Sequence, residues 1–128
     1  MIVQDIIQQL ETLAPLAYAE EFDNVGLLIG DKNTVVKGVL VTLDCLTEVV
    51  DEAVNNDCNL IVSFHPIIFK GLKSINGKTY VERVVQKAIR NDIAIYAIHT
   101  ALDNAFEGVN AGICDVLDLK NKSILMPQ

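Results

Sequence analysis

The chain contains only two histidines, His65 and His99, and both stand at the end of a short, strongly apolar segment. Asp44 ends a third such segment, and Asp103 lies four residues beyond His99. Imidazole and carboxylate groups together form a common ligand set for divalent metal ions, and they can also exchange protons with a substrate. These residue types predict a metal or substrate site, provided that the fold brings them together.

Each of these residues also has an ordinary structural role, and the sequence alone leaves both interpretations open. His65 precedes a proline and could end a strand in a turn, while His99 could donate to a backbone carbonyl. Asp103 could be a plain turn former, because aspartate side chains bond readily to neighbouring backbone. An aspartate that follows a strand often caps the next helix, so Asp44 could belong to a cap rather than to a site.

Three apolar segments predict strands whose two faces are both covered, because each is a continuous run of largely β-branched residues. The segments are 38–43, 60–64 and 93–98. Helical patterns alternate with them at 47–56, 80–90 and 108–117. Such alternation is typical of a parallel sheet flanked by helices, an αβα sandwich with right-handed crossovers. Ligands bind these sheets beyond the carboxyl ends of the strands, which is where Asp44, His65 and His99 fall.

The regions outside this alternation are an N-terminal helix, a loop and a short tail. Apolar residues at helical spacing predict a helix over 2–13, which Pro15 ends. Turn-forming residues indicate that 18–30 is a loop whose aliphatic residues pack inward. The tail at 123–128 is typical of a strand that begins and then stops. We therefore expect residues 1–128 to form a single α/β lobe that is a fragment of a longer chain.

Two of the predicted helices carry more detailed expectations. The hydroxyl of Thr47 is expected to cap the helix at 47–56. In the helix at 80–90, the apolar residues fall on one side, which is expected to face the sheet. That side consists of Val81, Val84, Val85, Ala88 and Ile89.

Composition and charge exclude several classes of protein. Apolar residues make up 51% of the chain and charged residues 21%, so it can bury a core and is not intrinsically disordered. The 10 basic against 17 acidic residues give a net charge of -7, which disfavours nucleic acid and anionic membranes as partners. No apolar run reaches the roughly 18 residues of a membrane span. The acidic start does not resemble a signal peptide.

The three cysteines, Cys45, Cys58 and Cys114, are odd in number and show no C-x-x-C spacing. This pattern disfavours both a disulfide framework and a structural zinc site made of cysteines. We expect buried, reduced thiols, which indicates a cytoplasmic protein.

Four segments occur in an order that resembles a known family. They are FDNVGLLIG at 22–30, VLVTLD at 39–44, IVSFHPIIFKGLK at 61–73 and IAIYAIHTALDNAFEGVN at 93–110. Together they resemble the Nif-three-like family of dinuclear metal-centre proteins, also called GTP cyclohydrolase I type 2 homologs. Members share a D-N-x-G-L loop, an S-H-H-P strand end and an H-T-x-x-D segment. The resemblance implies a two-lobed protein that assembles as a homo-oligomer, a hexamer, with this chain as its N-terminal lobe.

The resemblance also implies roles for the residues that match the family's motifs. His65 matches the second histidine of S-H-H-P, and Asp103 matches the aspartate of H-T-x-x-D, so both are expected metal ligands. His99 matches the histidine of H-T-x-x-D, where it would be a third ligand or a catalytic acid–base group. Three further residues would orient these groups from positions beside the metal. They are Asp23, Asn24 and Asp44.

The chain departs from the family in two ways. Phe64 stands where the family has the first histidine of the pair, and phenylalanine cannot bind a metal ion. No histidine follows His99, so the histidine and glutamate that the family draws from its C-terminal region are missing here. We expect one or two zinc, iron, manganese or magnesium ions in the full-length protein. In this chain alone we expect weak or absent occupancy and no activity.

Three functions remain open at this point. The first is a divalent-metal-dependent hydrolase that acts on a nucleotide-like substrate when full length, as the family's cyclohydrolase name implies. The second is a non-catalytic metal-binding protein, regulatory or scaffolding, that acts through its oligomer and protein partners. The third is an α/β domain that binds a small molecule without any metal.

Overall fold

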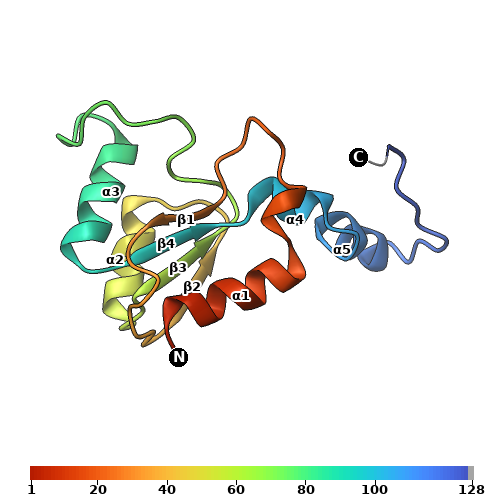
Figure 1. Cartoon of the computed structure of the whole chain (residues 1–128), viewed down its shortest axis with the longest axis horizontal. Helices are drawn as coiled ribbons and strands as arrows, with labels where there is room; N and C mark the ends of the chain where they lie inside the picture. Colours follow the sequence, from red (N-terminus) through yellow and green to blue (C-terminus); the bar gives the residue numbers. More distant parts are fainter. Residues whose placement is uncertain (127–128) are drawn as a thin grey trace.

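The three predicted apolar strands form most of one four-stranded sheet in a computed structural model, which describes residues 1–126 (Figure 1). They are β2 (Val39–Thr42), β3 (Leu60–Ser63) and β4 (Ala94–Ala97). These strands run parallel, and β3 lies between the other two, as the alternation of strands and helices predicts. The predicted α/β fold with helices on both faces of the sheet is therefore confirmed.

A fourth strand, β1 (Gly26–Ile29), corrects the prediction that 18–30 is only a loop. It pairs with β4 in the antiparallel sense, so the sheet is mixed and has the order β1-β4-β3-β2. The strand is hard to recognise because a glycine stands at its start and another just after its end. Gly30 has a φ of +104° and lies so close to β4 that a Cβ atom there would come within 2.6 Å of the Ala94 Cβ.

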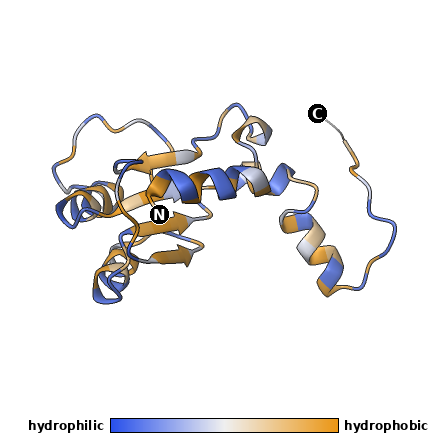
Figure 2. Ribbon diagram, turned by 60° about the horizontal axis from the view of Figure 1, so that its bottom comes forward, coloured by the Kyte–Doolittle hydropathy of each residue, from blue (hydrophilic) through white to orange (hydrophobic). Residues whose placement is uncertain are grey.

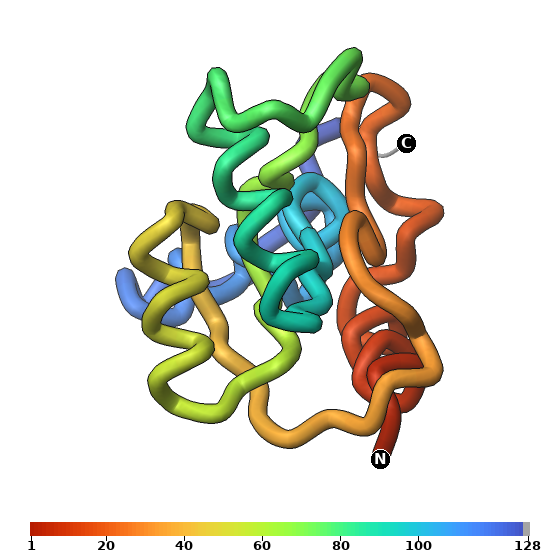
Figure 3. The backbone as a smooth tube through the Cα atoms, turned by 90° about the vertical axis from the view of Figure 1, so that its left-hand side faces the viewer, coloured from red at the N-terminus to blue at the C-terminus, as the bar shows by residue number. Residues whose placement is uncertain are grey.

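Helices cover both faces of the sheet. On one face lie α1 (Val3–Leu13) and α4 (His99–Asn104), with the short 3₁₀ helix η1 (Leu16–Tyr18) beside α4. On the other face α2 (Thr47–Asn55) and α3 (Tyr80–Arg90) lie side by side, as Figure 3 shows. The last helix, α5 (Val109–Val116), extends beyond the end of the sheet toward the C-terminus (Figure 1).

Two apolar cores explain why the central strands are continuously apolar. On β3 and β4, Ile61 and Ile95 pack toward α2 and α3, whereas Leu60 and Tyr96 pack toward α1 and α4. Figure 2 shows this apolar centre of the sheet between more polar helix surfaces. The edge strand β2 differs from the expectation, because Val41 remains 77% exposed. Its neighbour Val62 on β3 is buried in the core on the α1 side, so this face is covered over the central strands and exposed at the edge strand.

Several detailed expectations are corrected by the described helix ends. The helix α2 begins at Thr47 with Leu46 as its cap residue, and the Thr47 hydroxyl bonds to Glu48 instead of capping. In α3 the predicted inward face is confirmed for Val84, Val85 and Ala88, but Ile89 is half exposed.

The C-terminal region also differs from the prediction. Residues 123–126 form no strand, and the last two residues of the predicted tail strand lie outside the described residues. Beyond α5, the chain returns toward α4 as an irregular segment (Figure 1). Among the described helices, none is both long enough and apolar enough to cross a membrane.

All three cysteines are free, as predicted. Cys45 is buried, and its burial raises the pKa of the thiol to about 11. The predicted burial is confirmed for Cys45 alone, because Cys58 packs only at the border of a core and Cys114 lies on α5, so both are partly buried.

Candidate functional site

The candidate site lies where the three parallel strands end. Backbone bonds continue the sheet beyond the strands: His65 donates to the Leu43 carbonyl and His99 to the Phe64 carbonyl, both at 3.0 Å. These bonds hold the three segments after β2, β3 and β4 side by side. The two imidazole rings consequently meet, with their centroids 5.4 Å apart. The sequence prediction that both histidines gather at one edge of the sheet is confirmed.

His99 is held by a buried carboxylate. Its Nδ1 lies 3.0 Å and 2.9 Å from the two carboxylate oxygens of Asp23, which comes from the segment before β1. The side chain of Asp23 is fully buried, and that of His99 is 21% exposed. Asp23 also accepts bonds from the backbone N–H of Asn24 and from the backbone N–H and hydroxyl of Thr100.

These contacts fix the charge of Asp23 and the proton on His99. Burial opposes ionisation of the Asp23 carboxyl, but the bonds from His99, Thr100 and Asn24 outweigh it and hold its pKa below the ordinary range. An ionised carboxylate can only accept hydrogen bonds. Nδ1 of His99 therefore carries a proton, and in the neutral ring the lone pair lies on Nε2.

His65 has a similar partner in a different environment. Its Nδ1 lies 2.7 Å from a carboxylate oxygen of Asp44, but the two side chains are 46% and 57% exposed. Asp44 is thus paired with a histidine, and α2 has no side-chain cap, so the alternative of a capping Asp44 is not realised. This contact also leaves Nε2 of His65 free of the carboxylate.

Phe64 packs beside the two imidazoles, which also contact each other edge to face. Its ring makes edge-to-face contacts with His65 and His99, at centroid distances of 5.1 Å and 5.4 Å. The residue also packs against the core on the α1 side. An apolar ring therefore stands where a third imidazole would add a ligand.

Asn24 contacts neither histidine ring in the described structure. Its side-chain amide donates to the carbonyl of Ile68, which ties the segment before β1 to the segment after β3. Its side chain therefore binds backbone in the described structure, and the orienting role of Asn24 stays a prediction.

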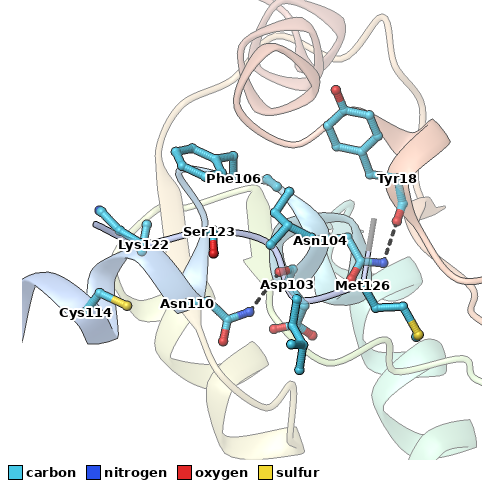
Figure 4. A pocket seen from close by; sticks show the side chains of 13 residues that line it. Tyr18, Asp103, Asn104, Phe106, Asn110, Cys114, Lys122, Ser123 and Met126 are labelled. Atoms are coloured by element: carbon cyan, nitrogen blue, oxygen red, sulfur yellow. Dashed lines mark hydrogen bonds between the residues drawn. The ribbon is translucent and has the colours of Figure 1, made fainter. Parts of the chain in front are cut away.

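Asp103 lies one helical turn after His99 on α4, but its carboxylate makes no described contact with the histidines. Its backbone carbonyl accepts a bond from the Asn110 side chain at 3.1 Å. Asp103 lines a cavity of about 650 Å³ that lies between α4, α5 and residues 122–126 (Figure 4). The same cavity is bordered by Tyr18 and Phe106, both about half exposed.

The residues described here fit only part of a metal site. Within 1–126, no three His, Cys, Asp or Glu side chains lie close enough together to hold a metal ion. The donor chemistry is suitable at His65 and His99, because both rings are oriented through Nδ1. Further ligands would have to come from a shift of Asp103 or from outside the described residues.

Thr100 is a site residue whose role sequence reasoning missed. It bonds to Asp23 through both its hydroxyl and its backbone N–H. Its position directly after His99 is the one signal that the sequence offers for it. In the structure β4 ends at Ala97, and His99 and Thr100 begin α4 instead.

A family comparison agrees with the sequence resemblance. The model of the Duf34/NIF3 family (NGG1p interacting factor 3) matches residues 1–128. The chain belongs to this family. The resemblance drawn from the four ordered motifs is therefore confirmed.

Curated relatives carry the name GTP cyclohydrolase 1 type 2 homolog. The one from Clostridium acetobutylicum is 38% identical over 123 residues, covering 96% of this chain and 46% of the relative. The one from Bacillus subtilis is 44% identical over 124 residues, covering 97% and 33%. This chain therefore spans about a third to a half of the length of these relatives.

Solved structures share the fold. A Bacillus cereus protein related to NIF3 matches all of this chain and 36% of its own, with a TM-score of 0.94 and 41% identity. Reduced HcgD from Methanocaldococcus jannaschii matches 98% of this chain and 50% of its own, with a TM-score of 0.90 and 28% identity. These coverages are consistent with one lobe of a larger protein.

Proposed function

We propose that this chain contributes part of a divalent-metal site to a hydrolase that acts on a nucleotide-like substrate in the full-length protein. The observation that carries the proposal is the pair of carboxylate-held imidazoles at one edge of the sheet. Both rings are bound through Nδ1, which leaves Nε2 of each ring available to bind a ligand. Metal-binding histidines commonly have a carboxylate partner of this kind.

In this proposal His65 and Asp103 are metal ligands, and His99 is a third ligand or the acid–base group beside the reacting water. A bound divalent ion supplies an acidified water molecule and a positive charge near the substrate. The residues of this chain do the rest: Asp23 keeps Nδ1 of His99 protonated, so that Nε2 can accept a proton from water. Asp44 orients His65 in the same manner.

The lining of the cavity beside Asp103 favours a substrate that contains a flat ring. Tyr18 and Phe106 border it with half-exposed aromatic side chains. Aromatic rings stack on nucleobases without regard to their identity. Figure 4 shows both rings together with the polar side chains of Asn104 and Asn110 around the same space.

Metal titration tests this proposal. We expect the full-length protein to bind Zn²⁺ or Mn²⁺ in calorimetry, and His65→Ala and Asp103→Ala each to weaken binding by about tenfold or more. Asp118→Ala is a matched control, because this exposed aspartate pairs only with Lys120 in the described residues. In the same two variants, the rate of GTP hydrolysis should fall in parallel with the metal affinity. Unchanged metal affinity in both variants would contradict the assignment of these ligands.

A second candidate is a non-catalytic metal-binding protein that acts as a regulator or scaffold through a homo-oligomer. Phe64 favours it, because an apolar ring packs against both imidazoles at a position where a histidine could supply a ligand for a second ion. Exposed apolar residues on α5 and just after it, such as Val116 and Leu117, would suit contact with other protein surfaces. Under this candidate, His65→Ala removes the metal while the oligomeric mass in light scattering stays the same, and no GTP hydrolysis is found in either form.

A further inference from the structure

Thr100, the second residue of α4, links two parts of the chain that are 80 residues apart in sequence. Its hydroxyl contacts a carboxylate oxygen of Asp23 and, at 3.0 Å, the backbone nitrogen of Glu20. Its own backbone N–H donates to the same Asp23 oxygen at 3.2 Å. Only 9% of Thr100 is exposed, so water has little access to replace these bonds.

The direction of these bonds follows from the groups involved. The backbone N–H of Glu20 can only donate, so the Thr100 oxygen accepts there. The single hydroxyl proton is then donated to the ionised Asp23 carboxylate. A serine could make both bonds, whereas a valine of nearly the same shape could make neither.

The segment 20–24 depends on these bonds for its position against α4. Asp23 belongs to this segment, not to α4, although it binds His99 on α4. A second connection comes from Asn104, whose amide donates to the Glu20 side chain at 3.0 Å and to the Tyr18 carbonyl at 2.8 Å. Removing the Thr100 hydroxyl would take away the acceptor of the Glu20 N–H and one of four donors to Asp23.

We propose that Thr100 is a positioning residue: its hydroxyl clamps segment 20–24 onto α4 and so holds the Asp23 carboxylate against Nδ1 of His99. The consequence is a single tautomer of the neutral His99 ring, with the proton on Nδ1 and the lone pair on Nε2. This inference deepens the proposed function, on which it rests for the use of Nε2. Its central claim concerns the free protein and needs no metal or substrate.

The test is two-bond ¹H–¹⁵N correlation NMR of the histidine rings in the 128-residue chain at pH 8, where a free imidazole is neutral. Protonated and bare ring nitrogens have widely separated ¹⁵N shifts. We expect the Nδ1–H form for His99 in the unchanged protein and in Thr100→Ser. In Thr100→Val we expect about a tenfold fall in the ratio of the two tautomers, as the loss of one charge-assisted bond implies. The His65 signals serve as an internal reference.

A matched control separates positioning from general destabilisation. Thr12→Val removes a hydroxyl that bonds the Gln8 carbonyl on α1, away from the site, and should leave the His99 shifts unchanged. An Nε2–H tautomer in the unchanged protein would overturn the proposal even if Thr100→Val failed to fold. An unchanged His99 ratio in a folded Thr100→Val would overturn it as well. If the unchanged protein shows the Nδ1–H tautomer but its full-length form binds no metal, the result would count against the proposed function alone.

Discussion

Two histidine–aspartate pairs stand side by side at the end of the sheet, and their surroundings differ. The His99 pair contains a fully buried carboxylate with four hydrogen-bond donors around it. The His65 pair contains a carboxylate that is 57% exposed, and its described side-chain contact is the histidine. The same two residue types are therefore built once as part of the interior and once as a surface contact.

The difference teaches which half of the site is fixed before a ligand arrives. When a buried carboxylate loses a hydrogen-bond donor, no water replaces that donor. Changing the geometry around Asp23 should therefore lower the free energy of unfolding strongly. An exposed pair is screened by solvent and contributes little to stability. We infer that His99 is preorganised, whereas the His65 side chain can adjust its position when a ligand binds.

The largest expected effect comes from Asp23→Asn. Asparagine keeps the size of the side chain, but it removes the charge and places an NH₂ group among four donors. We expect the free energy of unfolding to fall by about 3 kcal/mol, the size seen when one partner of a buried charged pair is removed. Urea unfolding followed by circular dichroism measures this. A loss of less than 1 kcal/mol would show that Asp23 behaves like a surface residue and would remove the contrast between the pairs.

Lowering the pH should remove part of the stability that the hydrogen bonds to Asp23 contribute to the fold. Because the folded-state pKa of Asp23 lies below its ordinary value, the bonds to this carboxylate stabilise the fold fully above the unfolded-state pKa, which is about 3.9. The contribution is lost as the pH falls through the lower pKa of the folded state. The difference in unfolding free energy between the unchanged protein and Asp23→Asn should therefore shrink below about pH 4. A difference that grows in acid would mean that the sign of the pKa shift is wrong.

Phe64 offers a way to sharpen the comparison, because its ring touches both imidazoles. In Phe64→His a third imidazole joins the edge, so we expect Zn²⁺ affinity in calorimetry to rise by about tenfold or more.

Phe64→Leu is the matched control for this substitution, since it removes the aromatic contacts without adding a ligand. Equal Zn²⁺ affinity in Phe64→His and Phe64→Leu would show that a side chain at position 64 does not reach a metal position beside His65 and His99. A gain confined to the histidine variant would instead support the assignment of that edge to a metal.

The sequence was sufficient to predict the central strands and the meeting of the two histidines. Continuous apolar runs predict buried parallel strands, and the polar residue after each run must then lie at one edge of the sheet. It was not sufficient for β1, because a four-residue strand that begins with one glycine and is followed by another gives too little pattern to distinguish a strand from a loop. The antiparallel pairing of β1 depends on contacts with β4 that are distant in sequence.

The candidate site was predictable in its histidines but not in its supporting bonds. Asp23 was expected only through the resemblance to the family, and its burial depends on segment 20–24 folding onto α4. Thr100 went unrecognised because a hydroxyl bond between residues 77 positions apart leaves no local signal. Asp103 was expected as a ligand from the resemblance, but α4, which places it one turn after His99, was not predicted from the sequence.

The smallest expected effect belongs to Asp44→Asn, the counterpart of Asp23→Asn in the exposed pair. The amide oxygen of asparagine can still accept from Nδ1 of His65, and solvent already screens the charge that is lost. We expect the unfolding free energy to change by less than about 1 kcal/mol in the same urea experiment. Should Asp44→Asn cost as much as Asp23→Asn, exposure could not be the property that separates the two pairs. A small change in stability together with weaker Zn²⁺ binding would mean that Asp44 orients His65 for a ligand without contributing to the fold.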